Sequence, residues 1–500
     1  MKGIKVVFVG LSLGLAAGPL FAGSLKVAAP FGDGMVLQRE RPVPVWGKAA
    51  GNVAVEVSFA GQTKKTTAAA TGVWRVTLDP LEASKEARSL TVVAGTERAS
   101  FTNVVVGEVW LCSGQSNMDM ALADNTPRYG DDIGRMVAQV TDKPFVRYMT
   151  APGREGWHAF TPEFLSAGRK AALAVHFALA LYEQLDVPVG VVVAALGGSN
   201  IDSWNPSVAK PGYPYLHHAH ITQLVPYALR GALWYQGETN VPEGAGYLAK
   251  LRQLDAAWRT LFEAPDLMFG YVQLAPFAYG KKNGVDLDEV FPVFLEAQAA
   301  FEREQTNAAM VVVNDIGNIK DIHPGHKWLV ARRLLLPVLK RCYGRAGIED
   351  HSPVPSRVAA VSNVVEIAFD HAKTLYVHDP DAPGDLSVPF ELEDEAGFWK
   401  PARILNYART DWTRHGNVDT NVLQLVADGV SRPVAVRYAW RKPWKGIVYN
   451  QVNLPLGTFR RDVVKPEAAD GVETDPYADA FRLETEGRQP AGQLTPRVRR

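Results

Sequence analysis

Ser116 is the residue of this chain whose surroundings best suit nucleophilic chemistry. It lies in the segment GQSNM at residues 114–118, directly after an apolar run at residues 104–111. A strand that stops at a glycine-containing turn and leads into a helix presents a serine hydroxyl at the carboxyl edge of a sheet, beside the N-terminal amides of the helix. Those amides could stabilise an oxyanion. Taken alone, the same pattern is also typical of an ordinary turn or helix cap.

Three further apolar runs also end in glycine and polar residues. They are residues 187–196, followed by GGSN at 197–200; residues 231–235, followed by QGETN at 236–240; and residues 309–313, followed by NDIG at 314–317 and DIHP at 321–324. Continuous apolar strands are typical of a parallel sheet that is buried on both faces. Because the carboxyl ends of parallel strands meet at one edge, we expect the polar groups of all four loops to gather there.

These loops contain a candidate for each group that acyl transfer requires, namely a nucleophile, a base, a group that orients the base, and N–H donors for the oxyanion. Ser116 is the candidate nucleophile and His323 the candidate base. Asp321 is the candidate orienting carboxylate, and Asp315 is the alternative. With one residue between them, Asp321 and His323 can meet only in a turn, which the following proline supports. The backbone amides of Ser116 and Gly198 are the natural oxyanion donors, because glycine lets the backbone approach a substrate closely.

In order and spacing, the four blocks resemble those of the SGNH-type sialate O-acetylesterases and their acetyl-polysaccharide esterase relatives. The matching segments are GQSNM at 114–118, GG at 197–198 with IDSW at 201–204, WYQGETN at 234–240 and DIHP at 321–324. The resemblance continues into residues 31–47 and 434–440, and it covers residues 25–463. It implies an α/β protein in which a three-layer α/β/α, flavodoxin-like SGNH-hydrolase domain with a parallel sheet is flanked by β-sandwich domains.

The resemblance also implies a side-chain donor for the oxyanion hole. The broad superfamily places an asparagine in the third block, whereas esterases with the Tyr-Gln-Gly-Glu version seen here use the glutamine side chain. This favours Gln236, with Asn240 second. Many superfamily members separate the acid and the histidine by two residues, so the single residue between Asp321 and His323 is a departure from the pattern.

Three residues close to these loops are candidates for contact with substrate. Asp202 and Trp204 come just after Gly198, where a tryptophan could stack on a sugar ring, although packing between domains explains it equally well. Glu238 has no carboxylate partner at a useful spacing, so a hydrogen-bonding strut is favoured over a base or a metal ligand.

The family resemblance implies a carbohydrate O-acetylesterase that removes acetyl groups from sialic acid or from plant or marine polysaccharides, through a Ser-His-Asp acyl-enzyme mechanism. No cofactor and no metal are expected. The alternative is a noncatalytic glycan-binding or cell-surface scaffold protein whose hydrolase domain is degenerate. The 53 basic and 53 acidic residues balance, so no overall field favours nucleic acid or an acidic membrane surface.

The N-terminus has the layout of a secretory signal peptide, with Lys2 and Lys5, an apolar stretch at residues 6–20, and small residues near position 22. Residues 1–22 are therefore expected to direct export, giving a secreted or periplasmic protein with no membrane contact after cleavage. The two cysteines, Cys112 and Cys342, exclude a disulfide-dense scaffold. Burial of Cys112 is favoured over a bridge between them. Nothing in the sequence indicates an oligomeric state.

At 500 residues the chain is too long for one hydrophobic core. Residues 25–105 contain short alternating strands and predict an N-terminal β-sandwich. In residues 106–345 strands alternate with helices at 171–185, 247–262 and 327–341, which predicts the hydrolase domain, with Pro337 expected to shorten or kink the last helix. Residues 346–463 return to strands and predict a second β-sandwich, and residues 464–500 have the composition of a poorly ordered tail.

Overall fold

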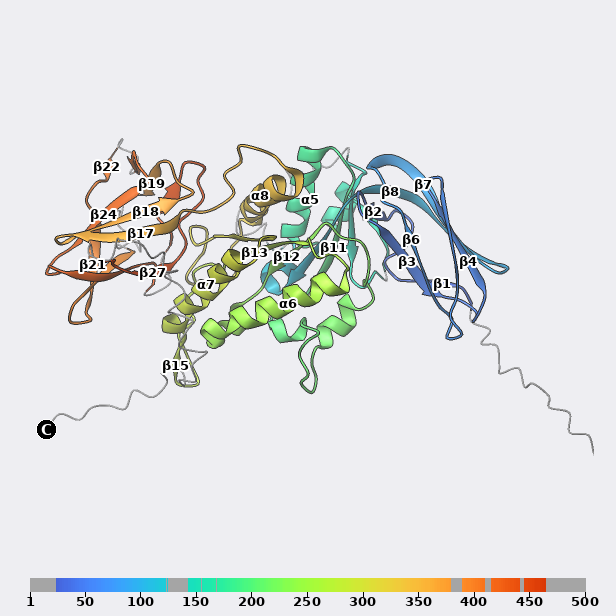
Figure 1. The fold of residues 1–500 in the computed structure, drawn as a ribbon, viewed down its shortest axis with the longest axis horizontal. Coiled ribbons are helices and arrows are strands. Elements are labelled where there is room, and N and C mark those ends of the chain that lie inside the picture. Colours follow the sequence, from blue (N-terminus) through green and yellow to red (C-terminus); the bar gives the residue numbers. More distant parts are fainter. Residues whose placement is uncertain are drawn as a thin grey trace, which may run out of the picture.

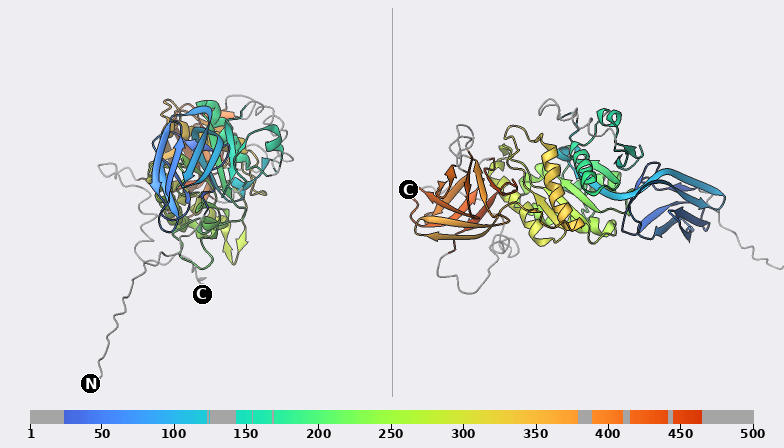
Figure 2. Two further views of the ribbon diagram at one scale, coloured as in Figure 1. Left: turned by 90° about the vertical axis from the view of Figure 1, so that its right-hand side faces the viewer. Right: turned by 90° about the horizontal axis from the view of Figure 1, so that it is seen from above.

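The computed structural model describes residues 24–464, except for 123, 125–142, 154, 168, 379–388, 410–414 and 441–444. The expected signal peptide and residues 465–500 of the expected tail lie outside the described residues. The described chain forms three parts along one long axis, with strands at both ends and a sheet with helices between them (Figures 1 and 2). In the described part of the chain, no helix combines the length and apolar character needed to cross a bilayer.

The N-terminal part consists of two groups of strands, as the alternating pattern predicts. One antiparallel group contains β1 (Lys26–Val27), β3 (Val43–Lys48) and β6 (Val73–Leu78). The other contains β2 (Val36–Gln38), β4 (Ala54–Phe59), β5 (Gln62–Thr67), β7 (Ser84–Ala94) and β8 (Glu97–Gly114). In β6 every second residue is buried, so Trp74, Val76 and Leu78 contribute to the core between the groups while their neighbours face solvent.

Strand β8 joins the N-terminal part to the central part. Its first half pairs with β7, and its second half pairs with strands of the central sheet, so the two share one sheet of 11 strands. The strand is 18 residues long, and every residue from Val104 onward is buried. It runs without interruption through the boundary expected at residues 105 and 106. The apolar run that leads to Ser116 is therefore the centre of a continuous sheet (Figure 1).

The central part of the sheet has the strand order β10-β9-β11-β8-β12-β13-β16. Its strands are β9 (Val146–Thr150), β10 (His158–Ala159), β11 (Val189–Ala195), β12 (Gly231–Tyr235), β13 (Met268–Val272) and β16 (Ala308–Val311). All neighbours from β9 to β16 are parallel, as the apolar runs predict. The expected all-parallel sheet needs correction, because the edge strand β10 is antiparallel to β9 and the N-terminal strands extend the sheet through β8.

Among the described residues, four long helices cover this sheet. They are α5 (Ala172–Leu185), α6 (Tyr247–Leu261), α7 (Leu287–Glu304) and α8 (Lys327–Pro337). Helices α5 and α8 pack together on one side of the strands, and α6 and α7 pack together on the other (Figure 1). The predicted helices correspond to α5, α6 and α8. As Pro337 predicts, α8 ends there, and the chain continues as one π-helical turn, Val338–Cys342. Helix α7 was not expected from the sequence.

Short elements complete the central part. They are the helices α1 (Ser116–Asp119) and α4 (Pro162–Ser166), the 3-10 helices Ile201–Ser203 and Glu238–Gly246, the π-helix His217–Ile221, and the two-stranded ribbon β14 (Lys281–Lys282) and β15 (Val285–Asp286). Helix α1 and both 3-10 helices directly follow β8, β11 and β12, so they lie at the edge of the sheet where those strands end.

The C-terminal part consists of two antiparallel sheets with their own hydrophobic core, consistent with the predicted second sandwich. One has the order β17-β18-β24-β21-β20-β25-β27 and the other β22-β23-β19-β26. Their bounds are β17 (Val354–Val361), β18 (Val364–Asp370), β19 (Leu375–His378), β20 (Phe390–Asp394), β21 (Trp399–Ile404), β22 (Ala408–Arg409), β23 (His415–Val418), β24 (Val422–Ala427), β25 (Pro433–Tyr438), β26 (Val448–Asn450) and β27 (Phe459–Asp462).

Candidate active site

Ser116 lies at the first position of α1, immediately beyond the end of β8. Gly114 makes this turn possible. Its φ is +139°, and a Cβ atom there would lie 2.1 Å from the carbonyl oxygen of Tyr235 on the neighbouring strand β12. Gly197, at the end of β11, passes close to Ser116, since a Cβ atom on Gly197 would lie 3.6 Å from that of the serine. The strand ends therefore hold the serine between two backbone segments.

His323 reaches Ser116 from the loop between β16 and α8. Its Nε2 atom lies 2.9 Å from Ser116 Oγ, a hydrogen-bonding distance between residues 207 positions apart in the chain. In this geometry Nε2 can accept the hydroxyl proton of the serine. The structure thus brings together the predicted nucleophile and the predicted base.

The two candidate orienting carboxylates are placed differently. Asp321 Oδ1 accepts a hydrogen bond from the backbone N–H of His323 at 3.0 Å, which forms the expected turn, and it lies 3.7 Å from His323 Nδ1. Asp315 instead forms a two-pronged ion pair with Arg333 of α8, with both N–O distances at 2.7 Å. Asp315 therefore links its loop to α8 through this ion pair, and Asp321 is the carboxylate beside the histidine.

A pocket of about 490 Å³ opens above Ser116 and His323. This volume is in the range of small-molecule sites. Its other described lining residues are Asp119, Met120, Asp124, Arg169 and Gly197. Arg169 forms an ion pair with Asp124 at 2.8 Å. Burial raises the pKa of the Asp119 carboxyl above its ordinary value, and the charge of Arg169 and the backbone N–H of Gly197 partly offset that rise. No local sequence pattern indicates Asp119, Asp124 or Arg169 as site residues, because only the fold places them beside Ser116.

The side-chain amides predicted for the oxyanion hole belong to a buried cluster that joins the loops. Gln236 Nε2 lies within hydrogen-bonding distance of three acceptors, namely Gln115 Oε1 at 2.9 Å, Asn240 Oδ1 at 2.7 Å and Ser199 O at 3.2 Å. Asn240 also donates from Nδ2 to Glu243 at 2.9 Å. Gln236 is fully buried, and neither Gln236 nor Asn240 is among the described residues that line the pocket.

The three residues expected to contact substrate are not among the described residues that line this pocket. Trp204 is fully buried and donates from Nε1 to Ser199 Oγ at 3.0 Å, which matches the packing alternative better than sugar stacking. Asp202 accepts a hydrogen bond from Lys250 at 3.0 Å. Glu238 is buried and accepts a hydrogen bond from Asn117. Substrate contact by these residues stays a prediction that the described pocket wall does not support.

Residues Glu349, His351 and His371 form the one group in the described part of the chain that could hold a metal ion. Both ring nitrogens of His351 already have partners, since Nδ1 lies 2.9 Å from Asp350 and Nε2 lies 2.6 Å from Arg341. The rings of His351 and His371 are stacked, with centroids 4.2 Å apart. Because a metal ion lies in the plane of each coordinating ring, stacked rings do not converge on one ion without moving.

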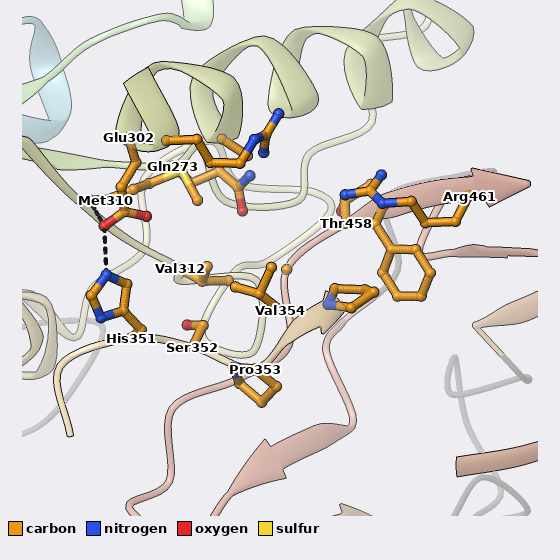
Figure 3. Close-up of a pocket in the computed structure, with 15 residues that line it drawn as sticks. Gln273, Glu302, Met310, Val312, His351, Ser352, Pro353, Val354, Thr458 and Arg461 are labelled. Carbon is orange, nitrogen blue, oxygen red and sulfur yellow. Dashed lines mark hydrogen bonds and ion pairs between the residues drawn. The ribbon is translucent and has the colours of Figure 1, made fainter. Parts of the chain in front are cut away.

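A small hollow of about 70 Å³ lies beside His351, between α7 and the C-terminal strands (Figure 3). Glu302 and His351 are in contact at one side of it, with His351 Nε2 3.5 Å from Glu302 Oε1. This hollow is far smaller than typical ligand sites, so it is not a candidate for a sugar. Elsewhere, Cys112 is buried and both it and Cys342 are free thiols, as the burial interpretation predicts.

Comparison with known proteins identifies the central part of the chain. Residues 106–327 match the family model described as carbohydrate esterase, sialic acid-specific acetylesterase. The chain is 28% identical over 480 residues to the human sialate O-acetylesterase, covering 83% of this chain and 87% of that protein. It is 26% identical over 498 residues to the mouse sialate O-acetylesterase, covering 81% and 87%.

A solved structure is similar over most of the chain. It is the crystal structure of a carbohydrate acetylesterase from Xanthomonas citri, with 29% sequence identity and a TM-score of 0.75, covering 88% of this chain and all of the other. The similarity therefore includes the flanking strands as well as the central part that carries Ser116 and His323. Residues 106–327 thus match the sialic acid-specific acetylesterases among the carbohydrate esterases, and most of the chain is similar to proteins named sialate O-acetylesterases and to a solved carbohydrate acetylesterase.

Proposed function

We propose that this protein is an exported carbohydrate O-acetylesterase that works through Ser116, His323 and Asp321. The observation that carries the proposal is the 2.9 Å separation of Ser116 Oγ and His323 Nε2 at an open pocket. The match of residues 106–327 to the sialic acid-specific acetylesterase model, and the similarity to relatives named sialate O-acetylesterases, support an acetylated sugar as the substrate. The signal-like composition of residues 1–22 supports export.

In the proposed reaction, His323 Nε2 takes the proton of Ser116 as Oγ attacks the acetyl carbonyl carbon. The tetrahedral intermediate then breaks its bond to the sugar oxygen, which leaves as a hydroxyl with the proton from Nε2. Water attacks the resulting acetyl-serine, again losing its proton to Nε2. The second intermediate releases acetate and returns the proton to Ser116. The negative charge of Asp321 favours the imidazolium that forms twice in this cycle.

The proposed oxyanion donors are the backbone N–H groups of Ser116 and Gly198 and the side chain of Gln236. The approach of Gly197 to Ser116 supports the backbone donors, because it brings the end of β11 beside the nucleophile. Gln236 Nε2 lies near three acceptors and has only two N–H bonds, so donating to the oxyanion would require it to release one of them. Asn240 is the second candidate for this role.

The proposed substrate pocket offers both acceptors and a donor to sugar hydroxyls. Asp119 and Asp124 can accept hydrogen bonds, and the Arg169 guanidinium, which is mostly exposed, can donate them. O-acetylated sialic acid and acetylated plant or marine polysaccharides are the proposed substrate classes. Acetate release from a matched panel of acetylated sialic acids, xylo-oligosaccharides and hexosamines distinguishes them.

Hydrolysis of p-nitrophenyl acetate by the wild-type protein and by a folded Ser116→Ala variant tests the mechanism. We expect the variant to lose several orders of magnitude in kcat. Equal activity in the two proteins would exclude the serine mechanism. Absence of activity in both, combined with tight glycan binding, would favour the noncatalytic scaffold. Loss of wild-type activity in a chelator would favour metal-assisted hydrolysis instead.

A further inference from the structure

Asn117 connects the nucleophile to the loop that carries the base. It follows Ser116 directly and is 1% exposed. Its Nδ2 atom donates a hydrogen bond to the carbonyl oxygen of Ile322 at 3.0 Å. Ile322 in turn directly precedes His323. A single side chain therefore links the residue after the nucleophile to the residue before the base, across more than 200 positions of sequence.

The rest of the Asn117 amide binds two buried charged groups. Nδ2 also donates to Glu238 Oε1, and Oδ1 accepts a hydrogen bond from Lys327 Nζ at 2.6 Å. Both N–H bonds and the carbonyl oxygen of the amide are thus engaged. Rotating the amide by half a turn would place its NH2 group against an ammonium and its oxygen against two acceptors. Only the observed orientation satisfies all of these partners.

Glu238 and Lys327 are themselves buried, at 8% and 0% exposure. The ammonium of Lys327 also lies over the ring of Tyr235, 5.2 Å from its centroid. Burial lowers the pKa of Lys327 to about 7 and raises the pKa of Glu238, with each charge partly compensating the other. Burying two charges costs more than burying apolar residues of the same size, so such a pair is a poor way to gain stability. Its best-attested use is to fix one arrangement of the groups around it.

The three residues come from the three segments that must meet for the chemistry. Asn117 follows β8, Glu238 follows β12, and Lys327 begins α8, four residues after His323. The hydrogen bond that the backbone N–H of His323 donates to Asp321 lies within a single loop and cannot set the position of that loop relative to Ser116. The bonds of Asn117 can, because they cross from one segment to the others.

We propose that Asn117, Glu238 and Lys327 form a positioning clamp that holds His323 Nε2 within reach of Ser116 Oγ. None of the three lines the described pocket, so they act through the catalytic pair and do not touch substrate. The inference rests on the proposed serine mechanism. The sequence led us to expect Glu238 as a hydrogen-bonding strut, and the clamp places it in a network with Lys327. Nothing in the sequence pattern indicates Lys327.

Lys327→Met tests the clamp, because it removes the ammonium and keeps an unbranched side chain that can remain buried. We expect kcat for p-nitrophenyl acetate, per folded molecule, to fall roughly 10- to 100-fold, since displacements of about 1 Å can cost 10²-fold in rate. KM should stay within about twofold, because the pocket wall is unchanged. Asn117→Ala, a second variant, removes all three bonds of the amide and should give the same division between kcat and KM.

Arg259→Met is the matched control. Arg259 pairs with the buried Asp255 on α6 at 2.8 Å and also contacts the carbonyls of Pro265 and Asn307, which precede β13 and β16. It therefore lies at the opposite edge of the sheet from Ser116. This variant should lower the melting temperature and leave kcat per folded molecule at the wild-type value.

Wild-type kcat per folded molecule in Lys327→Met would overturn the clamp, even if the melting temperature fell, because only a structural role would then remain. If Lys327→Met yields no folded protein, the same criterion applied to Asn117→Ala decides. Failure of the clamp is distinguishable from failure of the proposed function. In the first case Ser116→Ala is inactive and the clamp variants are fully active, whereas in the second Ser116→Ala itself retains wild-type activity.

Discussion

Replacing Asp321 by asparagine separates the two contributions of this residue to the site. The asparagine oxygen can still accept the backbone N–H of His323, which Asp321 Oδ1 does at 3.0 Å, so the turn is retained. The negative charge beside the imidazole is lost. The substitution therefore measures what the carboxylate charge contributes to the reaction.

The expected magnitude follows from the 3.7 Å separation between Asp321 Oδ1 and His323 Nδ1. Two unit charges at this distance interact by about 1 kcal/mol in bulk water and by about 4 kcal/mol at an effective dielectric constant near 20. The two side chains are 24% and 31% exposed, so solvent screens the pair and an intermediate value of about 2 kcal/mol is appropriate. Asp321→Asn should therefore lower kcat by about thirtyfold. This is much less than the roughly 10⁴-fold loss when a tightly bonded triad carboxylate is replaced by asparagine.

Steady-state kinetics with p-nitrophenyl acetate, on Asp321→Asn, His323→Ala and the wild type, checks this expectation. Asp315→Asn is the control, because Asp315 pairs with Arg333 and should affect melting temperature and not kcat. A loss above 10³-fold in Asp321→Asn would refute the reasoning from distance and show a direct carboxylate–imidazole hydrogen bond during catalysis. A fall in kcat of less than threefold would show that the charge of Asp321 does not stabilise the His323 imidazolium.

Three other changes have definite expected outcomes. Gly114→Ala should prevent folding, since the alanine Cβ would lie 2.1 Å from the Tyr235 carbonyl oxygen and overlap it. A native-like circular dichroism spectrum of this variant would contradict the prediction. Burial lowers the pKa of His176 to about 4, so the unfolded chain takes up a proton first as pH falls below 6.5. The free energy of unfolding should therefore drop by up to about 3 kcal/mol between pH 6.5 and 4. Urea titrations at several pH values should show that His176→Gln loses this part of the pH dependence. Arg169→Ala should raise KM for acetylated oligosaccharides roughly two- to fivefold and leave kcat/KM for p-nitrophenyl acetate within a factor of two. An equal loss of kcat/KM for the two substrates would argue against a contact between Arg169 and the sugar.

The broad arrangement of the site could be predicted because parallel strands impose it. The four apolar runs become β8, β11, β12 and β16 at nearly the predicted residues. Since their carboxyl ends meet at one edge, the loops after them had to come together. The 2.9 Å contact between Ser116 and His323 is the result of that geometry.

Other features of the site depend on contacts with residues far away in the sequence, which no local pattern predicts. Arg333 engages Asp315, and this leaves Asp321 as the carboxylate beside His323. Trp204 follows a glycine loop, as a sugar-stacking residue would, but the packing of the neighbouring segments buries it completely. Lys327 looks like an ordinary first residue of a surface helix, and only the assembled loops enclose its ammonium.

Local sequence by itself determined the strands, most of the long helices, the residues at the strand ends and the family resemblance. Hydrophobic periodicity and turn chemistry act over a few residues, so these features are readable from one chain. The tertiary structure alone decided that β8 unites two parts of the protein, which residues line the pocket, and which buried charges fasten the catalytic loops. These depend on the distances between side chains far apart in sequence, and such distances are set only when the whole sheet has assembled.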